Sequence, residues 1–157
     1  MNAVYAGSFD PFTTGHLHIV KESCRIFDKV IVVCAENKKK MPRFDRNEMR
    51  DAIKECMVDE GLDQKVEVIV SSDLVVDVAR DHGAEYLVRG LRSTSDFLYE
   101  EELAKANRML NPNIRTIYLR ADNDAVSSSF VREVLDRMYT VEHFVPEAIE
   151  KLIYRKD

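Results

Sequence analysis

Short apolar runs alternate along the chain with longer segments in which apolar residues recur every three or four positions. The runs typical of buried strands lie at residues 3–6, 29–35, 65–70, 85–88 and 115–119. The segments with helical periodicity end near residues 27, 61, 83, 110 and 138, and a last one opens at Pro146. This alternation predicts an α/β fold, a Rossmann-like doubly wound five-stranded parallel sheet with helices on both faces. We expect residues 1–157 to form a single domain.

Polar residues at the helix starts predict where those helices begin. Thr13 or Thr14 is suited to cap the first helix, since a hydroxyl there can accept from an unpaired N–H group. Asp45, followed three residues later by Glu48, forms a capping-box pattern for the second helix. Asp73 is expected to cap a short third helix that stops at residue 83. The long helix from about residue 95 to 110 and one starting at the serines of 127–129 complete the prediction.

Composition excludes several classes of function. The chain has 23 basic and 28 acidic residues and a net charge of -5, which argues against general nucleic-acid binding. No apolar run approaches the length of a membrane span, and the first residues do not resemble a secretion signal, so we expect a cytoplasmic protein that binds no membrane. Cys24, Cys34 and Cys56 form no C-x-x-C pair, and we interpret them as buried thiols rather than metal ligands.

Residues 1–16 combine a short strand, a turn that begins at Gly7, and a helix start. His16 falls in the first turn of that helix, where unpaired N–H groups and the helix dipole favour an anion. Turn glycines and a surface histidine would explain the spacing about equally well. The stretch contains neither G-x-G-x-x-G nor G-x-x-x-x-G-K-[ST], so it is not one of the common phosphate loops.

The loops after four predicted strands carry groups suited to binding phosphate. They contain Ser8 and His16; Lys38, Lys39 and Lys40; Arg89 and Arg92; and Ser127, Ser128 and Ser129. In a parallel sheet these loops meet at the carboxyl edge, where ligands bind. Taken singly, each has a simpler explanation: a solvated lysine run, a turn with surface arginines, and a serine N-cap. Their convergence favours nucleotide-phosphate chemistry. No nucleophile stands beside a base, which fits direct attack of one phosphate on another.

Three segments resemble known motifs. GSFDPFTTGH at residues 7–16 is similar to the signature of the H/T-x-G-H nucleotidyltransferase superfamily, and VSSSFVR at 126–132 to its I-S-S-S-x-x-[RK] motif. VRGLRSTSDFLYEEELAKAN at 88–107 closely resembles the R-G-L-R-x-x-x-D-F-x-Y-E segment of the bacterial phosphopantetheine adenylyltransferase family. The resemblance extends over nearly the whole chain in order.

The resemblance implies transfer of the adenylyl group of Mg-ATP to the 4'-phosphate of 4'-phosphopantetheine, giving dephospho-coenzyme A and pyrophosphate. It implies catalytic roles for Lys40, Arg92 and above all His16, which would stabilise the charge that grows on the ATP α-phosphate. The implied ATP-binding residues are Ser8, Phe9, His16, Gly90, Leu91, Arg92, Glu100, Asn123, Asp124, Ala125, Val126, Ser127, Ser128 and Ser129. The implied phosphopantetheine-binding residues are Ser8, Lys40, Val75 and Arg89.

The resemblance further implies Mg²⁺ that arrives with ATP, coenzyme A as a possible feedback ligand, and a homohexamer built as a dimer of trimers. No protein ligand for the metal is expected, since the sequence holds no compact acidic motif. Ser8 stands where the family usually has Thr, and the segment at 120–126 is shorter than usual and lacks an aromatic residue. Two alternatives therefore stay open. One is a sister enzyme that uses nicotinamide mononucleotide or CTP; the other is a non-catalytic binder of nucleotide or coenzyme A.

Overall fold

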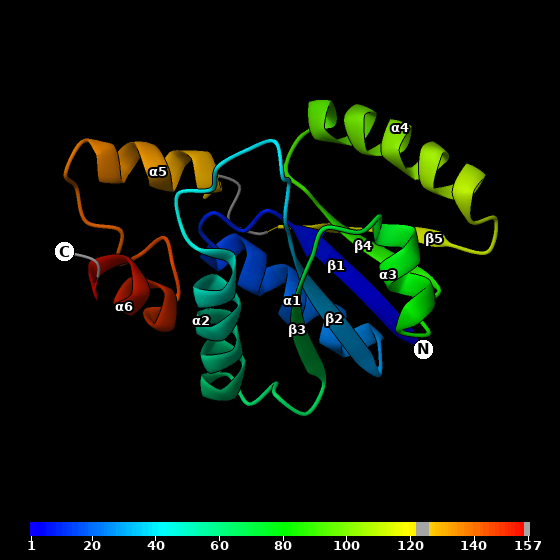
Figure 1. Cartoon of the computed structure of the whole chain (residues 1–157), viewed down its shortest axis with the longest axis horizontal. Helices are drawn as coiled ribbons and strands as arrows, with labels where there is room; N and C mark the ends of the chain where they lie inside the picture. The colour runs from blue at the N-terminus through cyan, green and yellow to red at the C-terminus, as the bar shows by residue number, and fades with distance from the viewer. Residues whose placement is uncertain (122–125, 156–157) are drawn as a thin grey trace.

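A computed structural model describes residues 1–121 and 126–155, and its centre is a parallel sheet of five strands. The strands are β1 (Asn2–Gly7), β2 (Lys29–Ala35), β3 (Val66–Ser71), β4 (Tyr86–Leu91) and β5 (Arg115–Arg120), in the order β3-β2-β1-β4-β5. The helices are α1 (Thr14–Ile26), α2 (Arg46–Asp59), α3 (Val75–Asp81), α4 (Thr94–Leu110), α5 (Ser128–Asp136) and α6 (Glu147–Arg155). The predicted α/β class and Rossmann-like sheet are confirmed (Figure 1).

Helices cover both faces of the sheet because successive side chains of each buried strand point to opposite sides. In β1, Ala3 and Tyr5 join the larger core cluster, whereas Val4 joins a smaller one on the other face. The larger cluster takes its helical residues from α1, α2, α5 and α6, and the smaller one from α3. Helix α4 packs on β4, β5 and α3. Helices α2 and α6 lie side by side in Figure 1.

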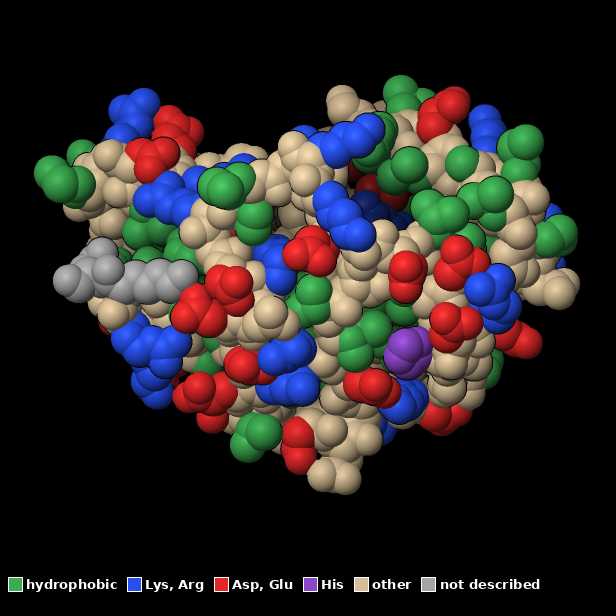
Figure 2. Space-filling model, viewed as in Figure 1, with side chains coloured by type: hydrophobic (Ala, Val, Ile, Leu, Met, Phe, Trp, Pro, Cys, Tyr) green, Lys and Arg blue, Asp and Glu red, His purple; other side chains and the backbone are tan. Residues whose placement is uncertain are grey.

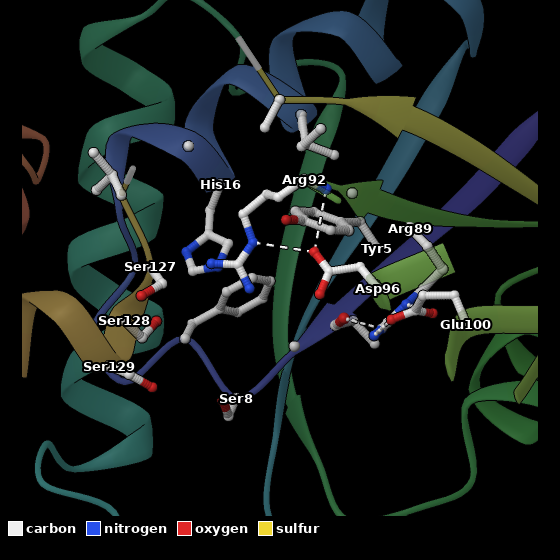
Figure 3. Close-up of a pocket in the computed structure, with 18 of the residues that line it drawn as sticks. Tyr5, Ser8, His16, Arg89, Arg92, Asp96, Glu100, Ser127, Ser128 and Ser129 are labelled. Carbon is white, nitrogen blue, oxygen red and sulfur yellow. Dashed lines mark hydrogen bonds and ion pairs between the residues drawn. The ribbon is translucent and has the colours of Figure 1, made fainter. Parts of the chain in front are cut away.

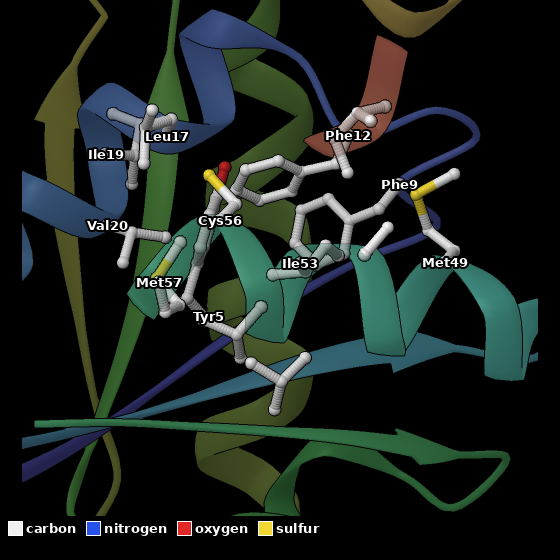
Figure 4. Close-up of a cluster of buried hydrophobic side chains, with 14 of the residues drawn as sticks. Tyr5, Phe9, Phe12, Leu17, Ile19, Val20, Met49, Ile53, Cys56 and Met57 are labelled. Atoms are coloured by element: carbon white, nitrogen blue, oxygen red, sulfur yellow. The ribbon is translucent and has the colours of Figure 1, made fainter. Parts of the chain in front are cut away.

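The larger core cluster reaches directly beneath the loop that follows β1. The rings of Phe9 and Phe12 are buried there beside Met49 and Ile53 of α2 (Figure 4). Full burial of a side chain of this size contributes roughly 1.5–3 kcal/mol. The loop that carries Ser8 is therefore anchored by two aromatic side chains, although its residues belong to no helix or strand.

Strand β4 is longer than the sequence pattern indicates. We expected it to end at residue 88, but Arg89, Gly90 and Leu91 continue the ladder with β5, with Gly90 opposite Leu119. A Cβ atom at Gly90 would lie 3.1 Å from Cγ1 of Ile19 in α1, so the glycine permits close packing of that helix on the strand. A charged residue and a glycine weaken a strand pattern, and here long-range pairing overrides that local signal.

The helix caps follow the prediction with one exception. The Thr13 side chain accepts from the His16 N–H group, and Asp45 accepts from two N–H groups at the start of α2. Ser127 caps α5. The expected Asp73 cap is wrong: Leu74 is the N-cap of α3 and makes no side-chain cap bond. Asp73 instead bonds through its N–H group and carboxylate to the Ser71 hydroxyl, a local turn that competes with capping.

The three cysteines are buried and free, as predicted from their spacing. Burial raises the pKa of the Cys34 and Cys56 thiols to about 12 in each case, so both thiols stay protonated at neutral pH. In the described part of the chain, none of the helices has the length and apolar character needed to cross a bilayer.

Candidate active site

A cavity of about 380 Å³ opens at the carboxyl edge of the sheet, between the ends of β1 and β4 and the first turns of α1 and α5 (Figure 3). It brings together most of the predicted ATP-binding residues. Those that line it are Ser8, Phe9, His16, Gly90, Arg92, Glu100, Val126, Ser127, Ser128 and Ser129, together with Arg89. Asn123, Asp124 and Ala125 lie outside the described residues. Leu91 ends β4 and is not among the lining residues.

The His16 ring is held by its own helix cap. The N–H group of Thr13 donates to Nδ1 at 2.9 Å, while the His16 N–H group donates to the Thr13 hydroxyl at 3.3 Å. Phe9 and Phe12 pack around the ring, with centroids 4.9 and 5.5 Å away. Because Nδ1 accepts a hydrogen bond, the neutral ring carries its proton on Nε2. The geometry therefore leaves the Nε2–H group as a donor for a bound ligand.

Burial, with a smaller contribution from the positive charges of Arg92 and Arg89, lowers the pKa of His16 to about 3. The imidazole is consequently neutral at physiological pH. A neutral ring can donate one hydrogen bond to a phosphate oxygen without delivering a proton. The positive charge of the cavity comes from its arginines instead.

This lowered pKa predicts a loss of stability in acid. Between the ordinary value of 6.5 and about 3, the unfolded chain binds a proton at His16 that the folded protein does not, so falling pH favours unfolding. Above pH 6.5 His16 is neutral in both states and contributes nothing to the pH dependence of stability. We expect His16→Gln to have a flatter decline in unfolding free energy between pH 6.5 and 4 than the wild type, measured by urea titration. Identical slopes for the two proteins would contradict the burial of a neutral ring.

The N-terminus of α1 is less open to an anion than the sequence suggests. The Thr14 N–H group donates to the Phe144 carbonyl at 3.0 Å, and the His16 N–H group donates to Thr13. Gly15 lines the cavity and is the first-turn residue between these two. The segment before α6 thus occupies an N–H group that the predicted anion site would use. Nothing in the sequence pattern indicates that this segment contacts α1.

Arg89 and Glu100 form a bidentate ion pair in the wall of the cavity. The Nε and Nη2 atoms of Arg89 donate to the two carboxylate oxygens at 2.7 and 2.8 Å, and Nη1 donates to the Ala6 carbonyl at 2.8 Å. Burial lowers the pKa of Arg89, but the hydrogen bond to Glu100 and the negative charge of that carboxylate together outweigh burial, and the net shift of the pKa is upward. Only 7% of Glu100 is exposed, so this carboxylate is part of the cavity wall and not of the outer surface of α4.

Arg92 is paired more loosely at the mouth of the cavity. The Asp96 carboxylate accepts from the Arg92 backbone N–H at 3.2 Å and lies 3.4 Å from its Nε atom (Figure 3). The Arg92 side chain remains 42% exposed. A phosphate could therefore compete for this guanidinium far more readily than for that of Arg89.

The three serines at the start of α5 have different partners. Ser127 accepts from the Phe130 N–H group, Ser128 donates to the Pro11 carbonyl at 2.8 Å, and Ser129 accepts from Arg132. Arg132 also donates to the Asp10 carbonyl at 2.6 Å and lines the cavity. Our prediction did not include Arg132 as a site residue. The signal that would have found it is the basic last position of the motif at 126–132, three residues after Ser129 on the same helix.

Two further cavities adjoin the first. Lys40 lines one of about 850 Å³, which also contains Lys38 and Lys39 and shares Ser8 and Arg132 with the first cavity. Val75 lines one of about 130 Å³ on the α3 and α4 side, and this shares Arg89 and Glu100 with the first cavity. The predicted phosphopantetheine-binding residues thus surround the site from two sides rather than lining a single pocket.

Tyr5, Ile19, Asp96 and Tyr99 also line the first cavity, although the sequence did not single them out. Tyr5 is interior to a strand and Ile19 to a helix, so both match an ordinary core pattern. Burial raises the pKa of the Tyr5 hydroxyl, which is therefore neutral at physiological pH. Asp96 and Tyr99 belong to the first turns of α4, where exposed polar residues are common. Only the approach of α4 to β4 places them at the cavity.

Comparison with known proteins places this site in a family. The cytidylyltransferase-like family model matches residues 4–134, which contain all three motifs. The phosphopantetheine adenylyltransferase of Geotalea daltonii is 42% identical over 156 residues, covering 98% of this chain and 95% of the relative. That of Lacticaseibacillus paracasei is 40% identical over 156 residues, covering 98% of this chain and 92% of the relative.

A solved structure supports the fold. A protein of Vibrio parahaemolyticus assigned as a nicotinate-nucleotide adenylyltransferase superposes with a TM-score of 0.73, covering 99% of this chain and 92% of its own. At 16% identity this likeness concerns the fold alone. The two phosphopantetheine adenylyltransferases, at 40% and 42% identity over almost the full chain, identify the family more specifically. The chain belongs to the cytidylyltransferase-like family of nucleotidyltransferases and, within it, to the phosphopantetheine adenylyltransferases.

Proposed function

We propose that residues 1–157 act as one domain that transfers the adenylyl group of ATP to the 4'-phosphate of 4'-phosphopantetheine, yielding dephospho-coenzyme A and pyrophosphate in coenzyme A biosynthesis. The observation that carries the proposal is the neutral His16 ring, which presents Nε2–H beside the arginines and serines of one cavity. The relatives that are about 40% identical over nearly the whole chain bear the name of this activity.

The reaction needs positioning and charge stabilisation rather than a covalent intermediate. An oxygen of the acceptor phosphate attacks the α-phosphorus of ATP in line, and the bond from that phosphorus to the bridging oxygen of pyrophosphate breaks. His16 Nε2–H donates to a non-bridging α-phosphate oxygen as negative charge grows there. Arg92 offers a partly exposed guanidinium to the same phosphates. None of the cavity's described side chains forms a nucleophile and base pair, in keeping with direct transfer.

The adjoining cavities suggest where the two substrates lie. The triphosphate of ATP would occupy the first cavity against Ser127, Ser128 and Ser129 at the start of α5. The acceptor phosphate would lie near Ser8, which borders both the first cavity and the one that contains Lys40. The pantetheine arm would run toward Val75, past the pair formed by Arg89 and Glu100.

Magnesium would enter the site as its complex with ATP. In the described residues, no three His, Cys, Asp or Glu side chains gather in a metal-binding group. Both carboxylates of the first cavity are already bonded to arginines, Glu100 to Arg89 and Asp96 to Arg92. The residues present do not fit a metal site built by the protein alone, so phosphate oxygens and water would supply most of the ligands.

Product analysis tests the proposal directly. The purified protein is mixed with Mg-ATP and 4'-phosphopantetheine, pyrophosphate release is followed, and the nucleotide product is identified by mass spectrometry. Parallel reactions contain nicotinamide mononucleotide as acceptor or CTP as donor. We expect dephospho-coenzyme A in the first reaction alone, and inhibition of that reaction by added coenzyme A, which contains the acceptor's pantetheine group. If no reaction releases pyrophosphate while ATP still stabilises the fold, the protein is a non-catalytic binder.

We also propose that the protein assembles as a homohexamer, a dimer of trimers, and the support for assembly is the outer face of α4. Glu100 is the one residue of this helix that is buried. Exposed large apolar residues on it that line none of the three cavities are Phe97, Leu98, Met109 and Leu110. Figure 2 shows hydrophobic side chains gathered over this part of the molecule. An apolar patch of this kind is typical of an interface between protein chains.

Placing a charge on that face should break the assembly. Leu98 is 65% exposed in the single chain, and Leu98→Glu would put an unpaired carboxylate into the interface. We expect light scattering to show a mass at least two-fold lower for this variant than for the wild type. Val58→Glu on α2, at 61% exposure, is the matched control and should keep the wild-type mass. A wild-type protein that is monomeric at micromolar concentration would refute the assembly.

A further inference from the structure

Arg46, the first residue of α2, is a buried cation that belongs to none of the motifs described above. Only 5% of its side chain is exposed. Nη1 donates to the carbonyl of Ser8, and Nη2 donates to the Asp10 carboxylate at 3.1 Å and to the Phe44 carbonyl at 3.0 Å. The planar guanidinium therefore spans two segments that are more than thirty residues apart in sequence.

Asp10 is the acceptor at which these segments meet. Besides Arg46, its carboxylate accepts from the backbone N–H groups of Arg43 and Phe44, each at 3.0 Å. Its own carbonyl accepts from Arg132 of α5. The Asp10 side chain is 14% exposed. One residue thus links the loop after β1, the start of α2 and the helix that follows the three serines.

The loop that contains Lys40, residues 36–44, is held at one of its two ends by the bonds of Arg43 and Phe44 to Asp10. We call it the Lys40 loop. At the other end the Glu36 N–H group donates to the Ser71 carbonyl at 2.9 Å. Between the two ends, Lys40 donates through its backbone only to the nearby Asn37 carbonyl, and its side chain is exposed. At the Asp10 end the Arg43 side chain also donates to the Arg132 carbonyl and pairs with Asp136 at 2.6 Å. The place that Lys40 takes relative to Ser8 is therefore set where the loop joins Asp10 and α5.

We propose that Arg46 is a positioning residue for adenylyl transfer, which fixes Ser8 and Lys40 in one spatial relation through its bonds to the Ser8 carbonyl and to Asp10. This inference rests on the proposed function, since Ser8 and Lys40 are the residues expected to hold the acceptor phosphate. Arg46 itself does not touch the reacting atoms, because its donors are engaged with protein oxygens. Its effect should therefore concern the acceptor far more than ATP.

The test compares Arg46→Met, Arg46→Lys and the control Arg50→Met. Arg50 lies one turn further along α2, and its guanidinium pairs with Asp51 and Asn47 at the surface. We expect Arg46→Met to raise KM for 4'-phosphopantetheine at least tenfold, while KM for ATP and kcat change less than threefold. Arg46→Lys keeps a positive charge beside Asp10. The increase in log KM for 4'-phosphopantetheine should therefore be at most half as large in Arg46→Lys as in Arg46→Met. Arg50→Met should match the wild type within twofold.

A second measurement does not depend on activity. In native-state hydrogen exchange, the amides of Arg43 and Phe44, which donate to Asp10, should exchange at least tenfold faster in Arg46→Met and no faster in Arg50→Met. If these amides exchange faster in Arg46→Met but the wild type shows no adenylyl transfer, the proposed function is refuted, whereas the role of Arg46 in holding the loop stands. An unchanged KM for the acceptor in folded Arg46→Met, or equal increases in both KM values, would overturn the positioning role. If Arg46→Met does not fold, the test uses Arg46→Lys. Its KM for 4'-phosphopantetheine should then rise more than its KM for ATP.

Discussion

Replacing His16 with Ala is expected to lower kcat for adenylyl transfer by about two to three orders of magnitude, the usual cost of losing one donor aimed at developing oxyanion charge. The structure supports this size of effect because the donor is pre-oriented. Thr13 fixes Nδ1 by a hydrogen bond, and the rings of Phe9 and Phe12 enclose the imidazole. No reorientation is then needed when the charge develops. Steady-state kinetics with Mg-ATP and 4'-phosphopantetheine measure the loss.

Two further variants separate this role from a general effect. His16→Gln can place an amide N–H group near the position of Nε2 and should recover part of the lost rate. His82→Ala is a matched control, since His82 lies at the end of α3 and lines none of the three cavities. We expect it to retain the wild-type kcat within twofold. Full activity of His16→Ala, with circular dichroism unchanged, would remove His16 from the mechanism.

The pair formed by Arg89 and Glu100 is expected to dominate stability at the site. Arg89→Met should lower the free energy of unfolding by about 3 kcal/mol, the lower end of the cost of breaking a buried ion pair. We choose the lower end because 32% of the Arg89 side chain is exposed, whereas only 9% of that of Glu100 is. The loss comes mainly from leaving the Glu100 carboxylate buried without its cation. Urea denaturation followed by circular dichroism measures it.

The double variant Arg89→Met/Glu100→Met gives the sharper result. It removes both charges together, so it should be more stable than Arg89→Met alone. The control is Glu133→Ala, which breaks the exposed pair between Glu133 of α5 and Arg137 at its C-cap and should cost less than about 1 kcal/mol. A double variant no more stable than the single one would mean that lost packing, rather than an unpaired charge, explains the effect. Arg89→Met should also raise KM for 4'-phosphopantetheine if Arg89 holds the acceptor.

The sequence by itself determined the fold class and the main groups of the site. The apolar periods of 2 and 3.6 distinguish strands from helices, and their alternation implies a parallel sheet with one functional edge. Ser8, His16 and Ser127 then follow directly after predicted strands or at helix starts, so their meeting needs no knowledge of distances. Capping by Thr13, Asp45 and Ser127 was equally predictable, because a cap bond joins residues only two or three positions apart.

The tertiary structure decided everything that depends on contacts between distant residues. Pairing with β5 makes Arg89 and Gly90 part of a strand, and the approach of α4 buries Glu100 against Arg89. Arg46 sits on a helix where an exposed arginine would be expected, and only the fold brings Ser8 and Asp10 to it. A local pattern reports the intrinsic preference of a segment. It does not report which distant carbonyl or carboxylate will satisfy a buried donor, because that partner is chosen by the packing of the whole chain.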